Sequence, residues 1–229
     1  MSWKIDHQCP QCGGPITLEE TDRFFTCRFC RVSLYITSNG PFQYYIPPKE
    51  QSDWMIYVPY WRFKGTVFSI RGAAINHRIL DTSRIAAQFL KLPFTLGVRP
   101  QTQNLKFAAG KLAGEFIRQT VELSSVLTAM ENQLKELGVD VVSEDTLEKA
   151  YIGETVSIIY APFRKAGSMW VDAVNEKYKY LMEDSIEVNA SMQPIQRDWS
   201  PDFLSAMCPD CGWDLSGERE SCAFICRNC

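Results

Sequence analysis

The feature that most constrains this chain is a four-cysteine pattern that occurs twice, once near each end of the sequence. In the first copy, the pairs Cys9-x-x-Cys12 and Cys27-x-x-Cys30 are separated by fourteen residues. The second copy keeps this spacing residue for residue, with its cysteines at Cys208, Cys211, Cys226 and Cys229. Nine cysteines in a sequence without a secretory signal pattern favour metal binding over disulfide bonds.

The chemistry of this pattern follows from the shape of a Cys-x-x-Cys turn, which directs both sulfurs to one side. Gly13 and Gly212 follow the first cysteine pair of each copy, and we expect both to adopt a positive φ. The spacer suits a β-hairpin, with Ile16 and Phe25 on its two strands in the first copy. Such a hairpin brings the two turns together and forms a closed tetrahedral site for one ion.

The two segments resemble zinc ribbons, and the resemblance covers residues 9–30 and 208–229. It implies a small β-hairpin module with one structural zinc ion in each segment, and it does not specify a function. Rubredoxin-like proteins bind redox-active iron with the same four ligands, but they usually carry Pro and Gly around the second pair. This sequence has Arg-Phe and Arg-Asn between those cysteines, so zinc is favoured and iron is the alternative.

Several residues near the cysteines have weaker interpretations. Arg28 and Arg227 occupy matching positions and are candidates to offset the negative charge of a four-thiolate site, although each is equally explained as a solvent-facing residue. Cys222 aligns with Arg23, so the repeat gives it no ligand role. His7 is expected to be an exposed histidine, and a ligand role is the alternative.

The expected domains are an N-terminal zinc ribbon (1–48), a central body (49–207) and a C-terminal zinc ribbon (208–229). A ribbon normally continues into a further strand after its last cysteine, as residues 31–36 would in the first copy. We therefore expect the second module to be truncated at Cys229 or to continue past it. The resemblance does not extend to the body.

The body contains an internal similarity that suggests β-structure. The segments MIYVPYWRFKG (55–65) and SIIYAPFRKAG (157–167) share the order Tyr, any residue, Pro and an aromatic residue. We interpret them as the starts of two three-stranded meanders that can join in one sheet, with an internal duplication around 55–82 and 157–182. Pro59 and Pro162 should then lie at a strand edge or a bulge, because proline donates no ladder hydrogen bond. Chance similarity is the rival explanation.

Helices are expected between these segments, which makes the predicted fold class α+β: two ribbon modules flanking a β-rich body with a few helices. Apolar residues step by four and three from Leu123 to Leu137, ahead of Gly138, and this stripe is expected to pack on the body's own sheet rather than on a partner helix. A second helix is predicted within 81–92, capped by Thr82 or Ser83. A third is predicted to open at 143–145.

Charge and missing motifs limit the possible functions. Residues 49–120 carry eleven Lys/Arg against four Asp/Glu, while 121–160 carry two against eight. We interpret both as solvated faces, and a basic surface for an acidic partner is the alternative. The sequence lacks nucleotide-binding and hydrolase motifs and has two histidines, so no catalytic residue is assigned. No apolar run is long enough to span a membrane, and a cytoplasmic location is expected.

Three functions remain at this stage. A non-enzymatic zinc-binding adaptor, or a subunit of a larger assembly with protein partners, is favoured because the metal sites are closed and no catalytic group is evident. Nucleic-acid binding is the second, although a pI near 5.5 opposes it. A rubredoxin-like iron electron carrier is the third, and no small-molecule ligand is assigned. The candidate surface for a nucleic acid or partner comprises Trp54, Tyr57, Tyr60, Trp61, Arg62, Lys64 and Arg71.

Overall fold

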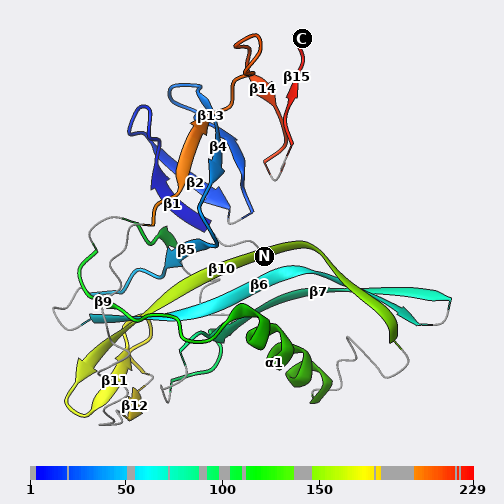
Figure 1. Ribbon diagram of the computed structural model, residues 1–229. Coiled ribbons are helices and arrows are strands. Elements are labelled where there is room, and N and C mark those ends of the chain that lie inside the picture. The colour runs from blue at the N-terminus through cyan, green and yellow to red at the C-terminus, as the bar shows by residue number, and fades with distance from the viewer. Residues whose placement is uncertain are drawn as a thin grey trace. The chain divides into compact units, whose positions relative to one another are not determined.

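Internal contacts in the computed structural model group the chain into two units (Figure 1). The ribbon unit comprises Met1–Pro47, Val98–Leu112 and Arg197–Cys229, and the sheet unit comprises Pro48–Gly97 and Ala113–Gln196. Both ends of the chain thus belong to one unit, whereas the sequence prediction treats each end as a separate module. The structure describes residues 4–19, 21–50, 55–71, 73–87, 92–97, 104–109, 112–136, 146–177, 179–181, 199–219, 221 and 223–229.

The named strands of the ribbon unit are short, and those within it pair antiparallel. Strand β1 (Lys4–Gln8) pairs with β2 (Pro15–Glu19), and the first Cys-x-x-Cys turn joins them. Strand β3 (Phe24–Thr26) pairs with β4 (Ser33–Thr37), and the second turn joins those two. Strand β13 (Asp202–Ser205), from the other end of the chain, pairs with the second edge of β4. One sheet of this unit therefore combines residues from both halves of the chain.

Two further strand pairs complete the ribbon unit. Strand β14 (Leu215–Ser216) pairs with β15 (Ile225–Cys226), and β5 (Phe42–Tyr45) pairs with β8 (Lys106–Phe107). The predicted hairpin across the cysteine spacer is therefore confirmed in the second copy. In the first copy the prediction is wrong, because β2 and β3 pair with β1 and β4 instead of with each other.

An aromatic cluster forms part of the core of the ribbon unit. The Phe107 ring contacts those of Phe42, Tyr44 and Trp199, with centroid distances between 5.4 and 6.4 Å. Rings at these separations stabilise a fold beyond the burial of their area. The cluster collects residues from three distant parts of the sequence, which explains how so small a unit holds together around its two cysteine sets.

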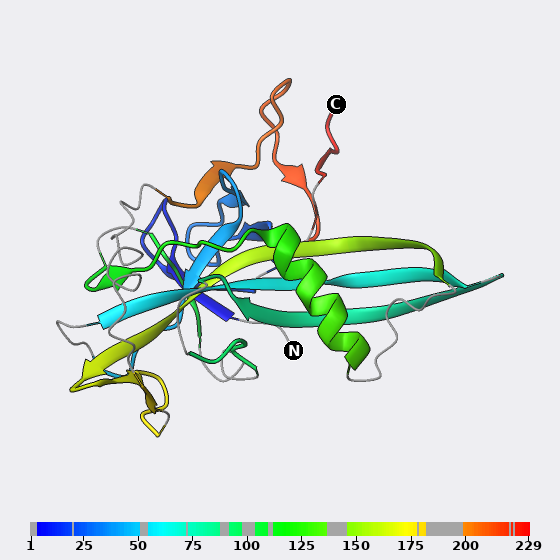
Figure 2. The same cartoon turned by 60° about the horizontal axis from the view of Figure 1, so that its bottom comes forward.

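The sheet unit is built on two long antiparallel strands, β6 (Met55–Arg71) and β10 (Thr146–Ala166). The opposite edge of β6 pairs with β7 (Ala74–Ile85) over most of its length and, near its start, with the short parallel strand β9 (Glu115–Phe116). Ten of the seventeen residues of β6 are aromatic or β-branched, which are the residue types that favour strands. Helix α1 (Leu123–Glu136) crosses over the long strands in the view of Figure 2 instead of running along them.

Strand β10 continues the sheet through β11 (Met169–Asp172), which in turn pairs with β12 (Lys179–Leu181). The start of α1 is fixed to the sheet by Trp61 of β6, whose indole Nε1–H donates to the Val121 carbonyl at 2.7 Å. The buried side chain of Val126 adds an apolar contact from the helix itself. Leu123 and Leu127 of the predicted apolar stripe are half-buried, and the side chains of its other members lie outside the described residues, so packing of the stripe on the sheet stays a prediction.

The two similar segments of the body lie side by side as neighbouring strands. In the β6–β10 ladder, Tyr57 opposes Pro162 and Pro59 opposes Tyr160, so the shared motif meets its own counterpart. The outer hydrogen bonds also match: Ala86 N–H donates to the Pro59 carbonyl (2.9 Å), and Ala173 N–H donates to the Pro162 carbonyl (3.0 Å). A duplication would produce this correspondence, and the duplication itself stays a prediction.

Each proline lies where an outer ladder ends, inside a long strand. The β6–β7 ladder begins at Tyr60, one residue after Pro59, and the β10–β11 ladder begins at Phe163, one residue after Pro162. The outer ladder therefore does not need the backbone N–H that each proline lacks, because that ladder ends one residue away. This placement satisfies the rule that proline avoids a continuous ladder.

The predicted α+β class is wrong, because the described chain is mostly β-structure and contains a single helix, α1. The helix predicted from Leu123 is confirmed. The helix predicted within 81–92 is wrong where the structure describes it, because Asp81–Ile85 continue β7 and the Ser83 hydroxyl accepts the Leu96 N–H (2.9 Å) instead of capping a helix. The prediction at 143–145 lies outside the described residues, but Thr146 already begins β10.

The described residues include no helix with the length and apolar character needed to cross a membrane.

Candidate metal centres

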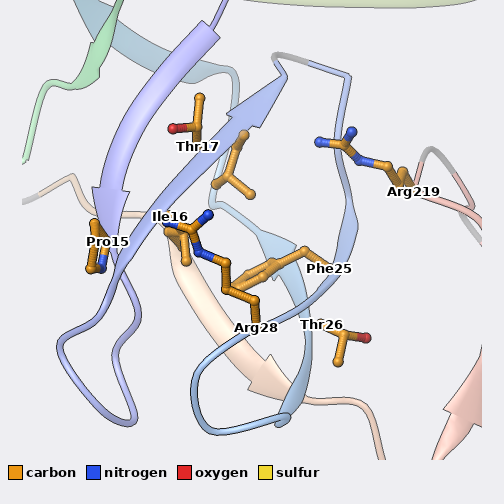
Figure 3. A pocket seen from close by; sticks show the side chains of 8 residues that line it. Pro15, Ile16, Thr17, Phe25, Thr26, Arg28 and Arg219 are labelled. Atoms are coloured by element: carbon orange, nitrogen blue, oxygen red, sulfur yellow. The ribbon is translucent and has the colours of Figure 1, made fainter.

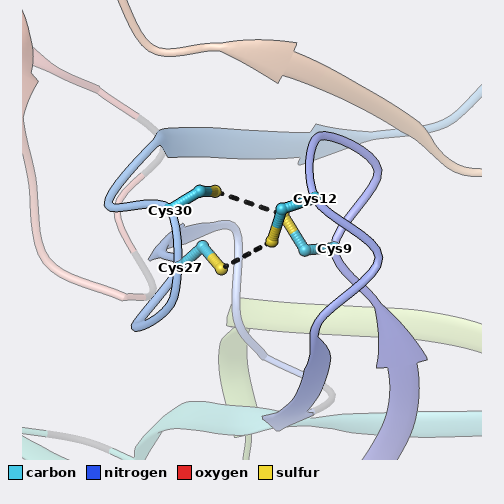
Figure 4. Close-up of side chains that lie close together, drawn as sticks. All are labelled: Cys9, Cys12, Cys27 and Cys30. Carbon is cyan, nitrogen blue, oxygen red and sulfur yellow. Dashed lines mark hydrogen bonds between the residues drawn. The ribbon is translucent and has the colours of Figure 1, made fainter.

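The structure brings the four predicted cysteines of each copy together. Within each set, the four sulfur atoms lie within 4.8 Å of one another. Figure 4 shows the first set, in which the Sγ atoms of Cys9 and Cys30 are 3.8 Å apart and those of Cys12 and Cys27 are also 3.8 Å apart. Each set can therefore hold one metal ion. The ligand positions of the second set are Cys208, Cys211, Cys226 and Cys229.

The sulfur separations fit a tetrahedral thiolate site. A Zn–S bond of about 2.3 Å places two ligand sulfurs of a tetrahedron about 3.8 Å apart. In the second set, the Cys208–Cys229 and Cys211–Cys226 separations are both 3.6 Å. A disulfide needs sulfurs about 2.05 Å apart, and all eight thiols are free. The donor set and its spacing thus suit a closed metal site better than cystine bridges.

The local backbone explains why the sulfurs converge. In the first turn, Gly13 N–H donates to the Cys9 carbonyl at 2.8 Å, and Gly212 makes the same bond to Cys208 at 2.9 Å. Both glycines have φ of 71°, which confirms the prediction from sequence. The second turn of the first copy closes identically through Arg31, whose N–H donates to Cys27 and whose φ is 61°. Arginine therefore adopts a conformation that normally favours glycine.

Backbone amides favour the thiolate form of one cysteine in each set. The N–H groups of Cys30 and Phe29 lower the pKa of the Cys27 thiol to about 6. The pKa of the Cys211 thiol is lowered to about 6, mainly by the N–H of Trp213 and to a smaller extent by the side chain of Asn228. Thiolate is the form that binds a metal, so these amides prepare one ligand in each set at neutral pH.

The two copies are joined to each other inside the ribbon unit. The carbonyl of Arg219 accepts the N–H groups of Arg23 (2.6 Å) and Phe24 (2.9 Å). Its guanidinium donates to the buried carboxylate of Asp22, which also accepts the Glu19 N–H at 2.7 Å. Burial raises the pKa of Asp22, and the Glu19 N–H and Arg219 oppose that shift. We call the Asp22–Arg219 contact the clasp.

Apolar contacts accompany the clasp. The Phe224 ring of the second copy lies 5.4 Å from Phe24 and 5.7 Å from Tyr35, measured between ring centroids. Sequence analysis missed the clasp because Arg219 aligns with Glu20 in the other copy, so the repeat gave no signal for its role. Only the difference between the two copies at this position could have marked it.

The residues near the cysteines that were given weaker interpretations differ in their burial and contacts. His7 is half-buried in β1, stacked on Phe203 at 4.9 Å, and is not part of the cysteine set, so neither the exposed nor the ligand interpretation holds. The Arg28 guanidinium lies 4.9 Å from the Phe29 ring centroid. Arg227 is exposed, and Cys222 lies outside the described residues.

The aromatic and basic set proposed as a nucleic-acid or partner surface lies largely in the core of the sheet unit. Tyr57, Tyr60 and Trp61 are buried, and Tyr57 stacks on Phe116 with 4.2 Å between centroids. Such rings are not available to stack on a base. Trp54 and the side chain of Arg71 lie outside the described part of the structure.

The two basic residues of this set differ in exposure. Arg62 is fully buried and forms two hydrogen bonds of 3.0 Å to Asp81 on β7, while burial lowers the pKa of its guanidinium. Lys64 is half-buried. Arg62 therefore joins β6 to β7 in the sheet unit. Its position between aromatic residues in the sequence did not predict this role.

Comparisons of the chain with protein-family models, curated proteins and solved structures give no match.

Proposed function

We propose that this protein is a non-enzymatic interaction module, in which one structural zinc ion in each cysteine set stabilises the ribbon unit and the sheet unit binds a protein partner. The closed four-cysteine sets support the structural role, because they leave no open position for a metal-bound water. In the described residues, no further group of three or more potential metal ligands accompanies them. Zinc is preferred to iron on the residues around the second turns.

The observation that carries the partner-binding role is the edge of β7. Among the described strands, β7 (twelve residues) pairs only with β6, so no described strand pairs with its other edge. Ile75 and Ile79 on this strand are 71% and 74% exposed. A long strand edge with exposed apolar side chains is a template for another protein strand, and soluble proteins usually protect such edges.

The test compares capture of partners by the full chain and by two variants. The double variant Ile75→Lys and Ile79→Lys adds charge to the open edge, and Phe94→Lys is the control because Phe94 is an exposed apolar side chain of the same unit. We expect the unmodified chain and the control to retain a stoichiometric protein after nuclease treatment, and the double variant to lose it. Equal capture by all three, or no partner at all, would contradict the proposal.

Metal content tests the other half of the proposal. We expect elemental analysis of the colourless purified chain to give two zinc ions per polypeptide. A coloured preparation with iron would instead favour an electron carrier, and cystine bridges would exclude both metals.

A further inference from the structure

The strands that link the two cysteine turns are arranged differently in the two copies. In the second copy, β14 and β15 pair with each other and close the module. In the first copy, the corresponding strands β2 and β3 do not pair with each other in the described structure. The second copy therefore has a paired hairpin between its cysteine turns, and the first copy does not.

The two copies also differ in side-chain size at one aligned position on these strands. Gly217 in the second copy has no room for a side chain, because a Cβ built there would lie 2.6 Å from the Phe224 ring. The aligned residue in the first copy is Leu18, which is 2% exposed, and Phe224 aligns with Phe25. A leucine side chain needs the space that the Phe224 ring occupies beside Gly217, and in the first copy β2 and β3 are not paired with each other.

The first copy contains a cavity of about 400 Å³, which is within the range of ligand sites in proteins. Figure 3 shows the Arg28 side chain reaching toward Ile16, while Arg219 enters from the second copy. The residues that line the cavity are Pro15, Ile16, Thr17, Leu18, Phe25, Thr26, Arg28 and Arg219.

The lining combines an apolar floor with positive charge. Leu18 and Phe25 are buried, and Ile16 is half-buried beside them. Arg219 is engaged in the clasp. Arg28 forms no ion pair with any residue that the structure describes, and its guanidinium lies over the Phe29 ring in a cation–π contact. An occupant that matches this lining carries an apolar side chain next to a carboxylate.

The edge of β2 specifies the shape of such an occupant. In the described structure, β2 pairs only with β1, so the edge that borders the cavity offers backbone groups to another strand. An extended peptide can pair with this edge while alternate side chains point to the floor and to Arg28.

We propose that the cavity between β2 and β3 binds an extended acidic segment of a partner protein. An apolar side chain of the segment packs on Leu18 and Phe25, and a neighbouring carboxylate pairs with Arg28. The inference rests on the proposed role as a protein-binding module, but it uses a different surface from the open edge of β7. The second copy lacks this site, because its strands are paired.

The repeat provides a matched control for the test. The immobilised zinc-loaded full chain is offered a pool of hexapeptides that alternate Asp or Glu with Val, Ile, Leu or Phe, and a second pool with Lys at the acidic positions. We expect the acidic pool to be retained and the Lys pool not. Arg28→Glu should reduce retention at least tenfold, while Arg227→Glu, at the aligned position of the copy whose strands pair with each other, should change it less than twofold.

A second pair of variants tests the cavity by its volume. Thr17→Trp fills the cavity and should abolish retention, and Ser216→Trp is the aligned control in the closed copy. Zinc content and circular dichroism confirm that each variant is folded. Equal effects of the aligned substitutions, equal retention of the two pools, or tighter binding of duplex DNA than of acidic peptides would overturn the inference. If the acidic pool fails while capture through the β7 edge persists, the cavity inference fails and the proposed function stands.

Discussion

At the residue scale, the cysteine turns hold both glycine and arginine in a left-handed conformation. Gly13 and Gly212 could be predicted to have positive φ, because glycine directly follows a cysteine pair. Arg31 has the same conformation in the equivalent place of the second turn, and nothing in an arginine side chain signals it. A left-handed conformation costs an ordinary residue about 1–2 kcal/mol, so the turn tolerates some strain here.

Two substitutions measure that strain in opposite directions. Arg31→Gly should stabilise the ribbon unit by about 1 kcal/mol, because glycine adopts a positive φ without the Cβ conflict. Gly13→Ala should destabilise it by about 1 kcal/mol, and this cost is purely conformational because no atom lies within 4 Å of the added Cβ. Urea unfolding at fixed free zinc measures both. A destabilising Arg31→Gly would show that its side chain matters more than its backbone.

At the element scale, the sequence indicated the long strands of the sheet unit but not their extent. The similar segments were expected to begin two meanders, and they begin outer ladders at Tyr60 and Phe163. The helix predicted within 81–92 failed although Thr82 and Ser83 are capping signals, because Thr82 is β-branched and also suits a strand. Tertiary pairing with β6 determined the outcome, and a short sequence window does not contain that information.

The pair of Arg62 and Asp81 is a second consequence of pairing between β6 and β7. Asp81→Asn should destabilise the sheet unit by about 3 kcal/mol, because it leaves the buried Arg62 guanidinium without its carboxylate. Arg62→Met combined with Asp81→Asn should recover most of that loss, since no buried charge remains. Thermal unfolding of the single and double variants tests this. Additive losses would mean that the two side chains do not depend on each other.

At the scale of the whole molecule, the two cysteine sets were predictable and their arrangement was not. Repeated cysteine spacing identified all eight cysteines that the structure brings together in two candidate metal sites, since few other requirements produce that pattern twice. It could not show that both copies share one unit through the β4–β13 ladder and the clasp of Asp22 and Arg219. Contacts between residues so distant in sequence leave no local periodicity to read.

Loss of one ligand should therefore affect both copies. Structural zinc contributes on the order of 10–16 kcal/mol of apparent binding free energy to small modules, so Cys27→Ser should unfold the first copy and weaken the second. We expect zinc loss above one ion per chain and rapid proteolysis within residues 4–50, while β6 and β10 stay protected. Hydrogen exchange and elemental analysis measure these effects. If the second site keeps its zinc at full affinity, the clasp does not couple the copies.

The sharing of β4 by two distant segments has a consequence for the order of assembly. During synthesis, residues 33–37 emerge long before residues 202–205, and the whole sheet unit is translated in between. One edge of β4 therefore has no partner strand until β13 has been synthesised. Nascent chains halted before residue 200 should bind a single ion and remain sensitive to chelators. The second ion should bind only after β13 has paired with β4.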